Sequence, residues 1–396
     1  MIIKPKIIGS LCISSHPLGC IISVKDQIQY VKSQKKIIGA KKVLVIGASS
    51  GYGLASRIVS AFGVGSSTLG VFMEYNGTEN RTASAGWYNS SAFENFAHKD
   101  NLYAKSINGD AFSLKTKKIA ANLIRKDLGK IDLLIYSLAS PRRLHPVSEK
   151  LFTSVLKSKE KHLIEKTINP FIPKFSMTSI KSATEEDIYN TVMVMGGEDW
   201  EMWIDFLKQE NLLENNVRTV AYSYMGSKVT YPIYKNGTIG SAKEHLKLTA
   251  DKINKKLITL NGYAAISMNK IVVTQASAAI PIVPLYTSLL FKIMKNKKIH
   301  ENCIQQMYRL FNDYLSLDQL GNKDESRCIR LDNLELCDDV QKEIESNWIT
   351  INNSNYQNYC DIQGYCDEFN KLYGFGHSDI DYSLDVNPIV KIPSVD

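Results

Sequence analysis

Residues 43–53 read Val-Leu-Val-Ile-Gly-Ala-Ser-Ser-Gly-Tyr-Gly, and this stretch decides the fold. Its first four residues form an apolar run that predicts a buried strand, and the apolar residues of 54–62 recur at helical spacing. Between strand and helix, Gly47, Gly51 and Gly53 give the spacing G-x3-G-x-G. The first glycine allows a sharp turn, the second lets the backbone approach a pyrophosphate, and the third lets the helix pack closely on the strand. The stretch therefore predicts a dinucleotide-binding turn, with the phosphates at the helix N-terminus.

Strands and helices alternate after this turn. Strands are predicted at 67–73, 102–107, 131–138, 218–223 and 266–274, and helices at 92–99, 114–128, 185–193, 199–209 and 241–260. Such alternation produces a parallel sheet with helices on both faces. The predicted fold class is α/β: a Rossmann-like, doubly wound parallel sheet of the short-chain dehydrogenase/reductase type, with insertions and a helical, acidic C-terminal appendage.

The charge divides the chain of 396 residues into two predicted units. Residues 1–320 carry 42 basic and 25 acidic side chains, whereas residues 321–396 carry 6 and 15. We expect residues 1–320 to form the dinucleotide-binding catalytic domain, with a Lys/Ser/Thr/Pro-rich insertion at about 141–186. Residues 321–396 then form an acidic appendage packed on it. A basic body suits a phosphorylated or acidic partner.

Several other classes of protein are disfavoured by composition. The lysines are spread over predicted helices without an aromatic-basic module, which argues against nucleic acid. Seven cysteines never occur as C-x2-C, and the seven histidines show no paired ligand spacing, so no metal site is predicted. We expect reduced thiols and a cytoplasmic protein. Residues 271–291 are uncharged, but polar residues and two prolines interrupt them, so no membrane insertion is expected.

Three positions at predicted strand ends fit a dinucleotide. Glu74 follows the second strand, where a carboxylate accepts hydrogen bonds from the adenosine ribose and repels the 2′-phosphate of NADP, which favours NADH. Asp110-Ala111 follows the third strand, and Leu138-Ala139 ends the fourth. In such folds these ends bind adenine and the nicotinamide ribose.

Residues 222–243 offer two tyrosine-lysine pairs as proton donor and partner. Tyr231 and Lys235 have the Tyr-x3-Lys spacing of ordinary short-chain dehydrogenases. Pro232 and the following Asn-Gly leave barely one helical turn there, so this pair is interpreted as a chance occurrence. Tyr234 and Lys243 can converge only if the tyrosine precedes the Asn-Gly turn and the lysine lies early in the next helix.

At this point the sequence resembles the FabV/TER-type trans-2-enoyl thioester reductases. The pattern Tyr224-x9-Tyr234-x8-Lys243 has the eight residues between tyrosine and lysine that separate this family from FabI-type reductases, which have six. The resemblance covers nearly the whole chain, in segments that include MIIKPKIIG, VLVIGASSGYGLASR, TASAGWYNSSAF, YSLASPRR, VMGGEDWEMW and YGFGHSDIDYSLDVNP. Residues 151–174 look diverged. The resemblance implies an NADH-dependent, monomeric reductase of enoyl-acyl carrier protein or enoyl-CoA.

The resemblance also implies roles for individual residues. Tyr234 matches the catalytic tyrosine, Lys243 the cofactor-binding lysine and Tyr224 the substrate-contacting tyrosine. The implied cofactor positions are Gly47, Ala48, Ser49, Ser50, Gly51, Tyr52, Met73, Glu74, Asp110, Ala111, Leu138, Ala139, Lys243, Val272, Val273 and Thr274. Lys243 is expected to lower the pKa of the Tyr234 phenol. Two alternatives stay open: a carbonyl reductase that uses Tyr231 and Lys235, and a nucleotide-binding protein without catalytic activity.

The acyl chain is predicted to lie against residues 276–291. The apolar side chains of this stretch are candidates for the pocket lining, namely Ile280, Ile282, Leu285, Leu289 and Phe291. Lys292, Lys295, Lys297 and Lys298 follow, and a phosphorylated or acidic carrier would dock at such a basic end. The alternative is an ordinary core helix with a solvated lysine end.

Overall fold

The computed structural model describes residues 1–316 and 328–395, and within them the main sheet has seven strands, with every neighbouring pair parallel. In sheet order the strands are β13 (Cys328–Arg330), β12 (Tyr263–Met268), β11 (Leu213–Ser223), β6 (Ile131–Tyr136), β3 (Lys42–Ile46), β4 (Ser67–Phe72) and β5 (Ala104–Asn108). From β3 the chain runs outward through β4 and β5, then returns to β6 on the other side. The predicted doubly wound sheet is confirmed, and its direction changes between β3 and β6, where such folds bind ligands.

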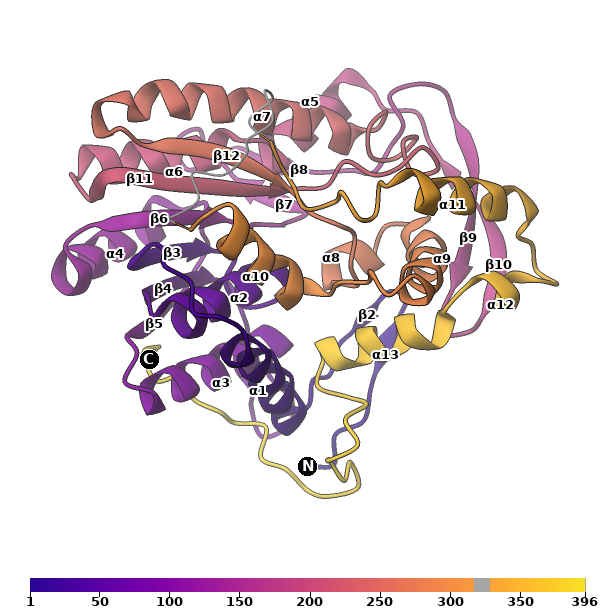
Figure 1. Ribbon diagram of the computed structural model, residues 1–396, viewed down its shortest axis with the longest axis horizontal. Helices are drawn as coiled ribbons and strands as arrows, with labels where there is room; N and C mark the ends of the chain where they lie inside the picture. The colour runs from indigo at the N-terminus through magenta and orange to yellow at the C-terminus, as the bar shows by residue number, and fades with distance from the viewer. Residues whose placement is uncertain (317–327, 396) are drawn as a thin grey trace.

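The strands are apolar on both faces because helices cover both. Along β3, Val43 and Val45 join one core cluster, whereas Leu44 and Ile46 join the other. The first cluster is built with α1 (Pro17–Ser33), α2 (Gly51–Ile58), α3 (Ala85–Lys99) and α10 (Cys303–Asp313). The second is built with α4 (Leu114–Leu123), α6 (Glu198–Gln209) and α7 (Thr238–Leu257). Figure 1 shows α7 on one side of the sheet and α1 to α3 on the other.

Three helices end in tighter or wider turns. Helices α2 and α4 continue into the π-helical turns η1 (Val59–Val64) and η2 (Ile124–Leu128), and α7 continues into the 3-10 turn η3 (Ile258–Leu260). Helix α3 begins seven residues before its predicted start at 92, at Ala85. Its first turns contain small polar residues that are buried, and the Ser90 hydroxyl donates to the Gly86 carbonyl at 2.7 Å. That bond within the helix satisfies the hydroxyl, so the polar sequence hides a buried helix.

The strand predicted at 266–274 is only half correct, because β12 ends at Met268. The amide of Asn269 still donates to the Ser223 carbonyl of β11 at 2.9 Å. Two residues later the Ile271 amide donates instead to the Glu335 carboxylate at 2.8 Å. The Glu335 side chain thus takes the place of β11 as the acceptor, and strand pairing stops. The apolar residues that follow are therefore a buried loop and not a strand.

Additional elements lie beyond the carboxyl ends of the strands. The stretch from 141 to 186 holds two antiparallel hairpins, β7 (Arg142–Leu144) with β8 (Leu151–Thr153) and β9 (Leu163–Asn169) with β10 (Lys174–Ile180), followed by the start of α5 (Glu185–Met195). A further short ribbon, β1 (Ile7–Ile8) with β2 (Leu11–Cys12), lies near the N-terminus. Figure 1 shows β9 and β10 at the end of the molecule that the sheet's carboxyl edge faces.

The C-terminal segment packs against the same edge. Its helices are α11 (Asp338–Thr350), α12 (Tyr356–Tyr359) and α13 (Ile362–Leu372). Two helices of the body lie earlier in the chain, α8 (Gln275–Ala278) and α9 (Val283–Asn296). Val340 and Ile344 of α11 share a core cluster with Leu285 and Leu289 of α9. The predicted boundary near residue 320 lies outside the described residues. The segment nevertheless contributes β13 to the main sheet, so it is joined to the body by backbone pairing as well as by packing.

Candidate active site

The glycine turn has the close approaches that its sequence predicts. Gly47 follows β3 with φ +84°, and a Cβ there would lie 2.2 Å from the Ser137 carbonyl oxygen at the end of β6. A Cβ at Gly53 would lie 1.8 Å from the Gly47 carbonyl oxygen. No side chain caps helix α2 at Ser50. The first amides of α2 are therefore available to an anion at the point where the sheet changes direction.

Of the residues between the glycines, Ala48 and Tyr52 are held by contacts within the protein. Ala48 is buried, and its amide donates to the Val71 carbonyl at 3.1 Å. The Tyr52 hydroxyl donates to the Lys270 carbonyl, and its ring meets Tyr222 edge-on with centroids 6.0 Å apart. The Tyr52 side chain is thus engaged in packing, and its backbone is the part that can face a dinucleotide.

Glu74 lies immediately after β4 and next to the glycine turn. The Ser49 hydroxyl donates to Glu74 Oε1 at 2.6 Å, and burial raises the pKa of this carboxyl while hydrogen bonds from Ser49 and Ser84 lower it. A Cβ at Gly86 would lie 2.0 Å from the same oxygen, so α3 comes close only because that residue is glycine. Met73 beside it is 64% exposed, which leaves its side chain free at the open edge. The structure thus brings Met73, Glu74 and Ser49 together.

Asp110 and Ala111 follow β5 and rest on a buried ion pair. Asp110 Oδ1 accepts from the Phe112 amide at 2.9 Å, which fixes the turn. The Lys117 ammonium donates to the Ala111 carbonyl at 2.9 Å and pairs with Asp199 at 2.7 Å, with both side chains almost completely buried. Burial lowers the pKa of Lys117 and raises that of Asp199, and in each case the partner's charge opposes the shift.

The two remaining cofactor segments follow β6 and β12. After β6, Leu138 is partly buried and Ala139 is exposed. After β12, Val272 and Val273 are buried, and Thr274 caps α8 by accepting from the Ser277 amide at 3.0 Å. Thr274 Cγ2 lies 3.6 Å from where a Cβ on Gly51 would be, so this loop and the glycine turn are adjacent.

Tyr224 and Tyr234 form an aromatic pair at the carboxyl edge. Tyr224 follows β11, and Tyr234 lies in the turns before α7. Their rings meet edge to face, with centroids 4.6 Å apart and an interplanar angle of 85°. Tyr234 is buried among Leu285, Leu289 and other apolar side chains. Its hydroxyl has no hydrogen-bond partner among residues 1–316 and 328–395.

Lys243 lies in the second turn of α7, after the Asn-Gly turn, as convergence with Tyr234 requires. Burial lowers its pKa to about 8, and no charged side chain of the described residues offsets this effect. The expected effect of Lys243 on Tyr234 is not seen. Burial first, and then the nearby charges of Glu335 and Tyr365, raise the pKa of Tyr234. Tyr234 is therefore a neutral phenol, which donates a hydrogen bond rather than accepting one.

The competing pair, Tyr231 and Lys235, is arranged differently. Both residues lie in turns rather than on one helical face. Lys235 is exposed, and its ammonium lies 4.9 Å from the centroid of the Tyr231 ring. The lysine is thus stacked on its own neighbour at the surface, and this geometry does not favour a carbonyl reductase built on the pair.

Sequence reasoning missed three buried side chains around the two tyrosines. Glu335 is completely buried and accepts from the hydroxyls of both Tyr224 and Tyr286. Tyr365 of α13 is buried too, and within the described chain its hydroxyl has no partner. Glu335 and Tyr365 come from the C-terminal segment. The acidic excess of that segment gave no sign of which carboxylate turns inward.

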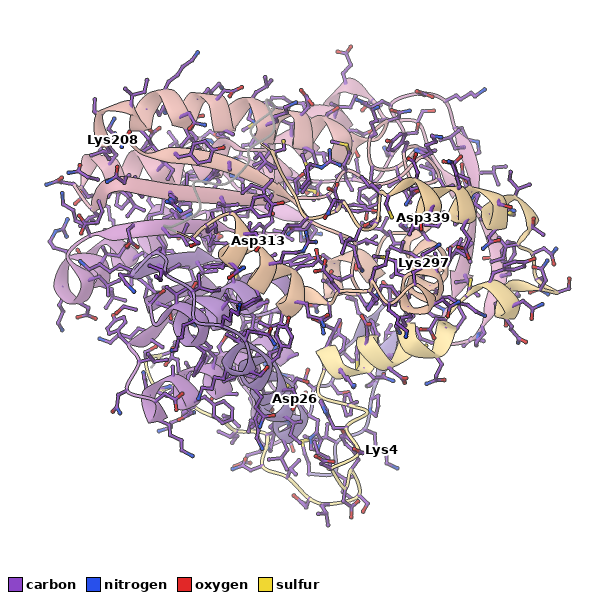
Figure 2. The ribbon with its side chains drawn as sticks, in the orientation of Figure 1. Lys4, Asp26, Lys208, Lys297, Asp313 and Asp339 are labelled. Atoms are coloured by element: carbon purple, nitrogen blue, oxygen red, sulfur yellow. The ribbon has the colours of Figure 1, made fainter. Side chains whose placement is uncertain are left out.

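The stretch predicted to hold the acyl chain is largely core. Ile282, Leu285, Leu289 and Phe291 are fully buried. Leu285 and Leu289 share the cluster of Tyr234, and the partly buried Ile280 packs against that cluster. Three of the four lysines after it contact the C-terminal segment: Lys292 donates to the carbonyl of Asn358, Lys295 pairs with Asp361 at 2.7 Å, and Lys297 pairs with Asp339 at 3.0 Å. Lys298 is exposed and pairs with no acidic side chain of the described residues. Figure 2 labels Lys297 and Asp339 on neighbouring helices. Partners within the chain favour the core-helix interpretation over a free docking patch.

Within residues 1–316 and 328–395, no helix combines the length and the apolar character needed to cross a membrane. The same residues contain no group of three His, Cys, Asp or Glu side chains that could hold a metal ion. None of the seven cysteines, all of which lie among them, forms a disulfide.

Fold and site together define a Rossmann-like dinucleotide-binding protein with a mostly buried tyrosine at the carboxyl edge of the sheet. Family models match almost the whole chain: the NAD(P)H binding domain of trans-2-enoyl-CoA reductase at residues 2–79, the trans-2-enoyl-CoA reductase catalytic region at 81–316, and an enoyl reductase FAD binding domain at 323–386. The chain belongs to the trans-2-enoyl-CoA reductase family.

Individual relatives match over their full lengths. The chain is 54% identical to the trans-2-enoyl-CoA reductase (NADH) of Ruminiclostridium cellulolyticum over 392 residues, which cover 99% of each chain. It is 52% identical to the enoyl-acyl-carrier-protein reductase (NADH) of Flavobacterium psychrophilum over 395 residues, covering 100% of both. Among solved structures, Clostridium acetobutulicum trans-2-enoyl-CoA reductase in complex with NADH superposes with a TM-score of 0.95 at 42% identity, covering 98% of each chain.

In the described part of the segment that matches the FAD description, residues 328–386, helix α11 does not favour a flavin dinucleotide. A helix N-terminus favours a pyrophosphate where its amides are free and no anion competes for them. Helix α11 follows β13, but its first turn carries Asp338 and Asp339, and the loop before it holds Asp332 and Glu335. These carboxylates would repel the pyrophosphate.

Proposed function

We propose that this protein reduces the carbon-carbon double bond of trans-2-enoyl thioesters, with NADH as the hydride donor. The observation that carries the proposal is the Tyr234 hydroxyl. The Tyr234 side chain is 7% exposed at the carboxyl edge, and its hydroxyl has no hydrogen-bond partner in the described chain. The hydroxyl is not one of the completely buried polar atoms, so a ligand can reach it, and it stands at the catalytic position of the family pattern.

The cofactor residues are the turn Gly47 to Tyr52, with Met73-Glu74, Asp110-Ala111, Leu138-Ala139, Val272 to Thr274 and Lys243. The turn and the first amides of α2 would hold the pyrophosphate. Glu74 would accept hydrogen bonds from the adenosine ribose and exclude a 2′-phosphate. Lys243, whose charge has no partner among the described groups, would bind the nicotinamide ribose hydroxyls.

NADH supplies the hydride, which passes from nicotinamide C4 to the β-carbon of the enoyl thioester. Negative charge then develops on the thioester oxygen, and Tyr234 stabilises it by donating a hydrogen bond. The α-carbon must finally gain a proton, from Tyr234 or from water. A neutral Tyr234 suits this task because it carries the proton before the reaction begins.

The carrier of the acyl group is acyl carrier protein or coenzyme A. We propose that the enzyme works as a monomer in the cytoplasm. The seven cysteines form no disulfide, although three of them are partly exposed, and this supports a reducing compartment. Purified protein at working concentration should then elute at the mass of one chain.

The test compares Tyr234→Phe with Tyr231→Phe. With crotonyl-CoA or crotonyl carrier protein as substrate, Tyr234→Phe should lower kcat by about two to three orders of magnitude with the fold intact, since it removes one oxyanion donor. Tyr231→Phe should change little. The assay follows NADH oxidation, with a ketone as the alternative substrate. Equal losses in the two variants, or turnover only with the ketone, would refute the proposal.

A further inference from the structure

Glu335 joins four elements through one buried carboxylate. It lies in the loop between β13 and α11 and has no exposed surface. Its Oε1 accepts from the Tyr224 hydroxyl at 2.8 Å and from the Tyr286 hydroxyl at 2.7 Å. Its Oε2 accepts from the Ile271 amide at 2.8 Å. Tyr224 follows β11, Tyr286 belongs to α9, and Ile271 follows β12, so the carboxylate fixes these elements against each other.

A carboxylate in this place is costly to bury, and an apolar residue of similar size would often serve stability as well. Burial raises the pKa of the Glu335 carboxyl, and the nearby charge of Lys270 and the three hydrogen-bond donors oppose that rise. Lys270 is itself buried and donates to the Ile271 carbonyl at 2.8 Å. The packing of this region therefore does not explain why a carboxyl group with three hydrogen-bond donors lies here. The bond to Tyr224 suggests what the group contributes.

Tyr224 directs its only hydroxyl proton to Glu335. A thioester presents acceptors and no donors, so Tyr224 cannot donate to the thioester oxygen while this bond is intact. Its ring remains in edge-to-face contact with the Tyr234 ring, at 4.6 Å between centroids. Of the two tyrosines, Tyr234 is the one with a free hydroxyl.

We infer that Glu335 is a positioning residue that acts through Tyr224. By holding the Tyr224 hydroxyl it fixes the ring on which the Tyr234 ring rests, and it leaves Tyr234 as the single donor to the developing oxyanion. This inference rests on the proposed function. It assigns Tyr224 a supporting role, in which any contact with the substrate is made by its ring.

The main variant is Glu335→Gln, which keeps the size of the side chain. An amide has one acceptor oxygen, so it cannot serve both the tyrosines and the Ile271 amide. A small displacement of Tyr234 should lower kcat about 10- to 100-fold, while KM for NADH stays within about twofold. The matched control is Glu94→Gln in α3. Glu94 is also fully buried; it accepts from the Ser394 amide at 3.0 Å and hydroxyl at 2.7 Å and lies 3.9 Å from the Arg57 guanidinium, and it makes no hydrogen bond to either tyrosine.

Both variants should lose thermal stability, because each leaves a buried donor without its acceptor. Only Glu335→Gln should lose kcat when both are assayed well below their unfolding temperatures. Equal kcat in the two variants would overturn the inference. An inactive wild type would overturn the proposed function and the inference together, whereas an active wild type with a fully active Glu335→Gln overturns the inference alone.

A double-mutant cycle shows whether the effect passes through Tyr224. Tyr224→Phe removes the hydroxyl but keeps the bonds of Glu335 to Tyr286 and Ile271, so the protein should fold even if Glu335→Gln does not. Alone it should lower kcat by a factor close to that of Glu335→Gln. In the Tyr224→Phe background, Glu335→Gln should add less than about threefold. Full activity of Tyr224→Phe, or multiplicative losses in the double variant, would show that Glu335 does not act through Tyr224.

Discussion

Gly53→Ala is the sharpest test of the dinucleotide turn. The new Cβ would lie 1.8 Å from the Gly47 carbonyl oxygen, a distance that must grow by at least about 1.2 Å to reach the shortest tolerable contact of 3.0 Å. Gly47 cannot retreat towards β6, because it lies against the Ser137 carbonyl. The start of α2 must therefore move away from the turn. A shift of that size stretches a hydrogen bond of about 2.9 Å to about 4 Å, which abolishes it.

The loss can be estimated from the bonds involved. One charge-assisted hydrogen bond from an α2 amide to a phosphate is worth about 1.5–3 kcal/mol, so the loss of one such bond should raise Kd for NADH about 10- to 100-fold. A fluorescence titration with NADH measures this, and circular dichroism during heating checks the fold. Gly39→Ala is the control, since the nearest atom to its Cβ would be a Val64 methyl at 3.4 Å. NADH binding within twofold of wild type in Gly53→Ala would refute the assigned turn.

Two further predictions concern the cofactor. Wild type should prefer NADH to NADPH, and Glu74→Ser should narrow this preference because it removes the carboxylate that repels a 2′-phosphate. The ratio of kcat/KM with NADH to kcat/KM with NADPH measures the preference. Equal use of the two cofactors by wild type would contradict the placement of Glu74. Lys243 has a pKa of about 8 in the free chain, so its ammonium is lost as the pH rises through that value and NADH affinity should fall above it. Lys243→Arg, which stays protonated, should flatten this dependence, and identical pH profiles of Kd in the two proteins would exclude Lys243 as a cationic ligand.

The parts of the site that the sequence predicts are those that depend on local chain geometry. The turn at Gly47 and Gly53 can be predicted because close approaches demand glycine at fixed spacing. Strand ends such as Glu74 can be predicted because parallel strands bring their carboxyl ends to one edge. The burial of β3 can be predicted from its continuous apolar run, because helices cover both faces of the sheet and alternate side chains of the strand enter the core on each face.

The parts that the sequence does not reveal depend on contacts between distant segments. Glu335 meets Tyr224 across 111 residues, and nothing near it distinguishes it from the other acidic residues of the C-terminal segment. The same carboxylate ends β12 early by taking the Ile271 amide, an acceptor that apolar periodicity cannot predict. The raised pKa of Tyr234 has the same origin, because burial and Glu335 act on it from elements the local motif does not contain.

The opposite charges of the body and the C-terminal segment therefore have a use within the molecule. Lys295 with Asp361, Lys297 with Asp339, and Lys228 with Glu345 tie the segment to α9 and to the turn before Tyr234. Each pair is at least partly exposed and individually weak, but all three join the body to the C-terminal segment that also carries Glu335. A charge pattern that suggests an external acidic partner is thus partly satisfied inside the chain, by the same segment whose Glu335 and Tyr365 lie near Tyr234.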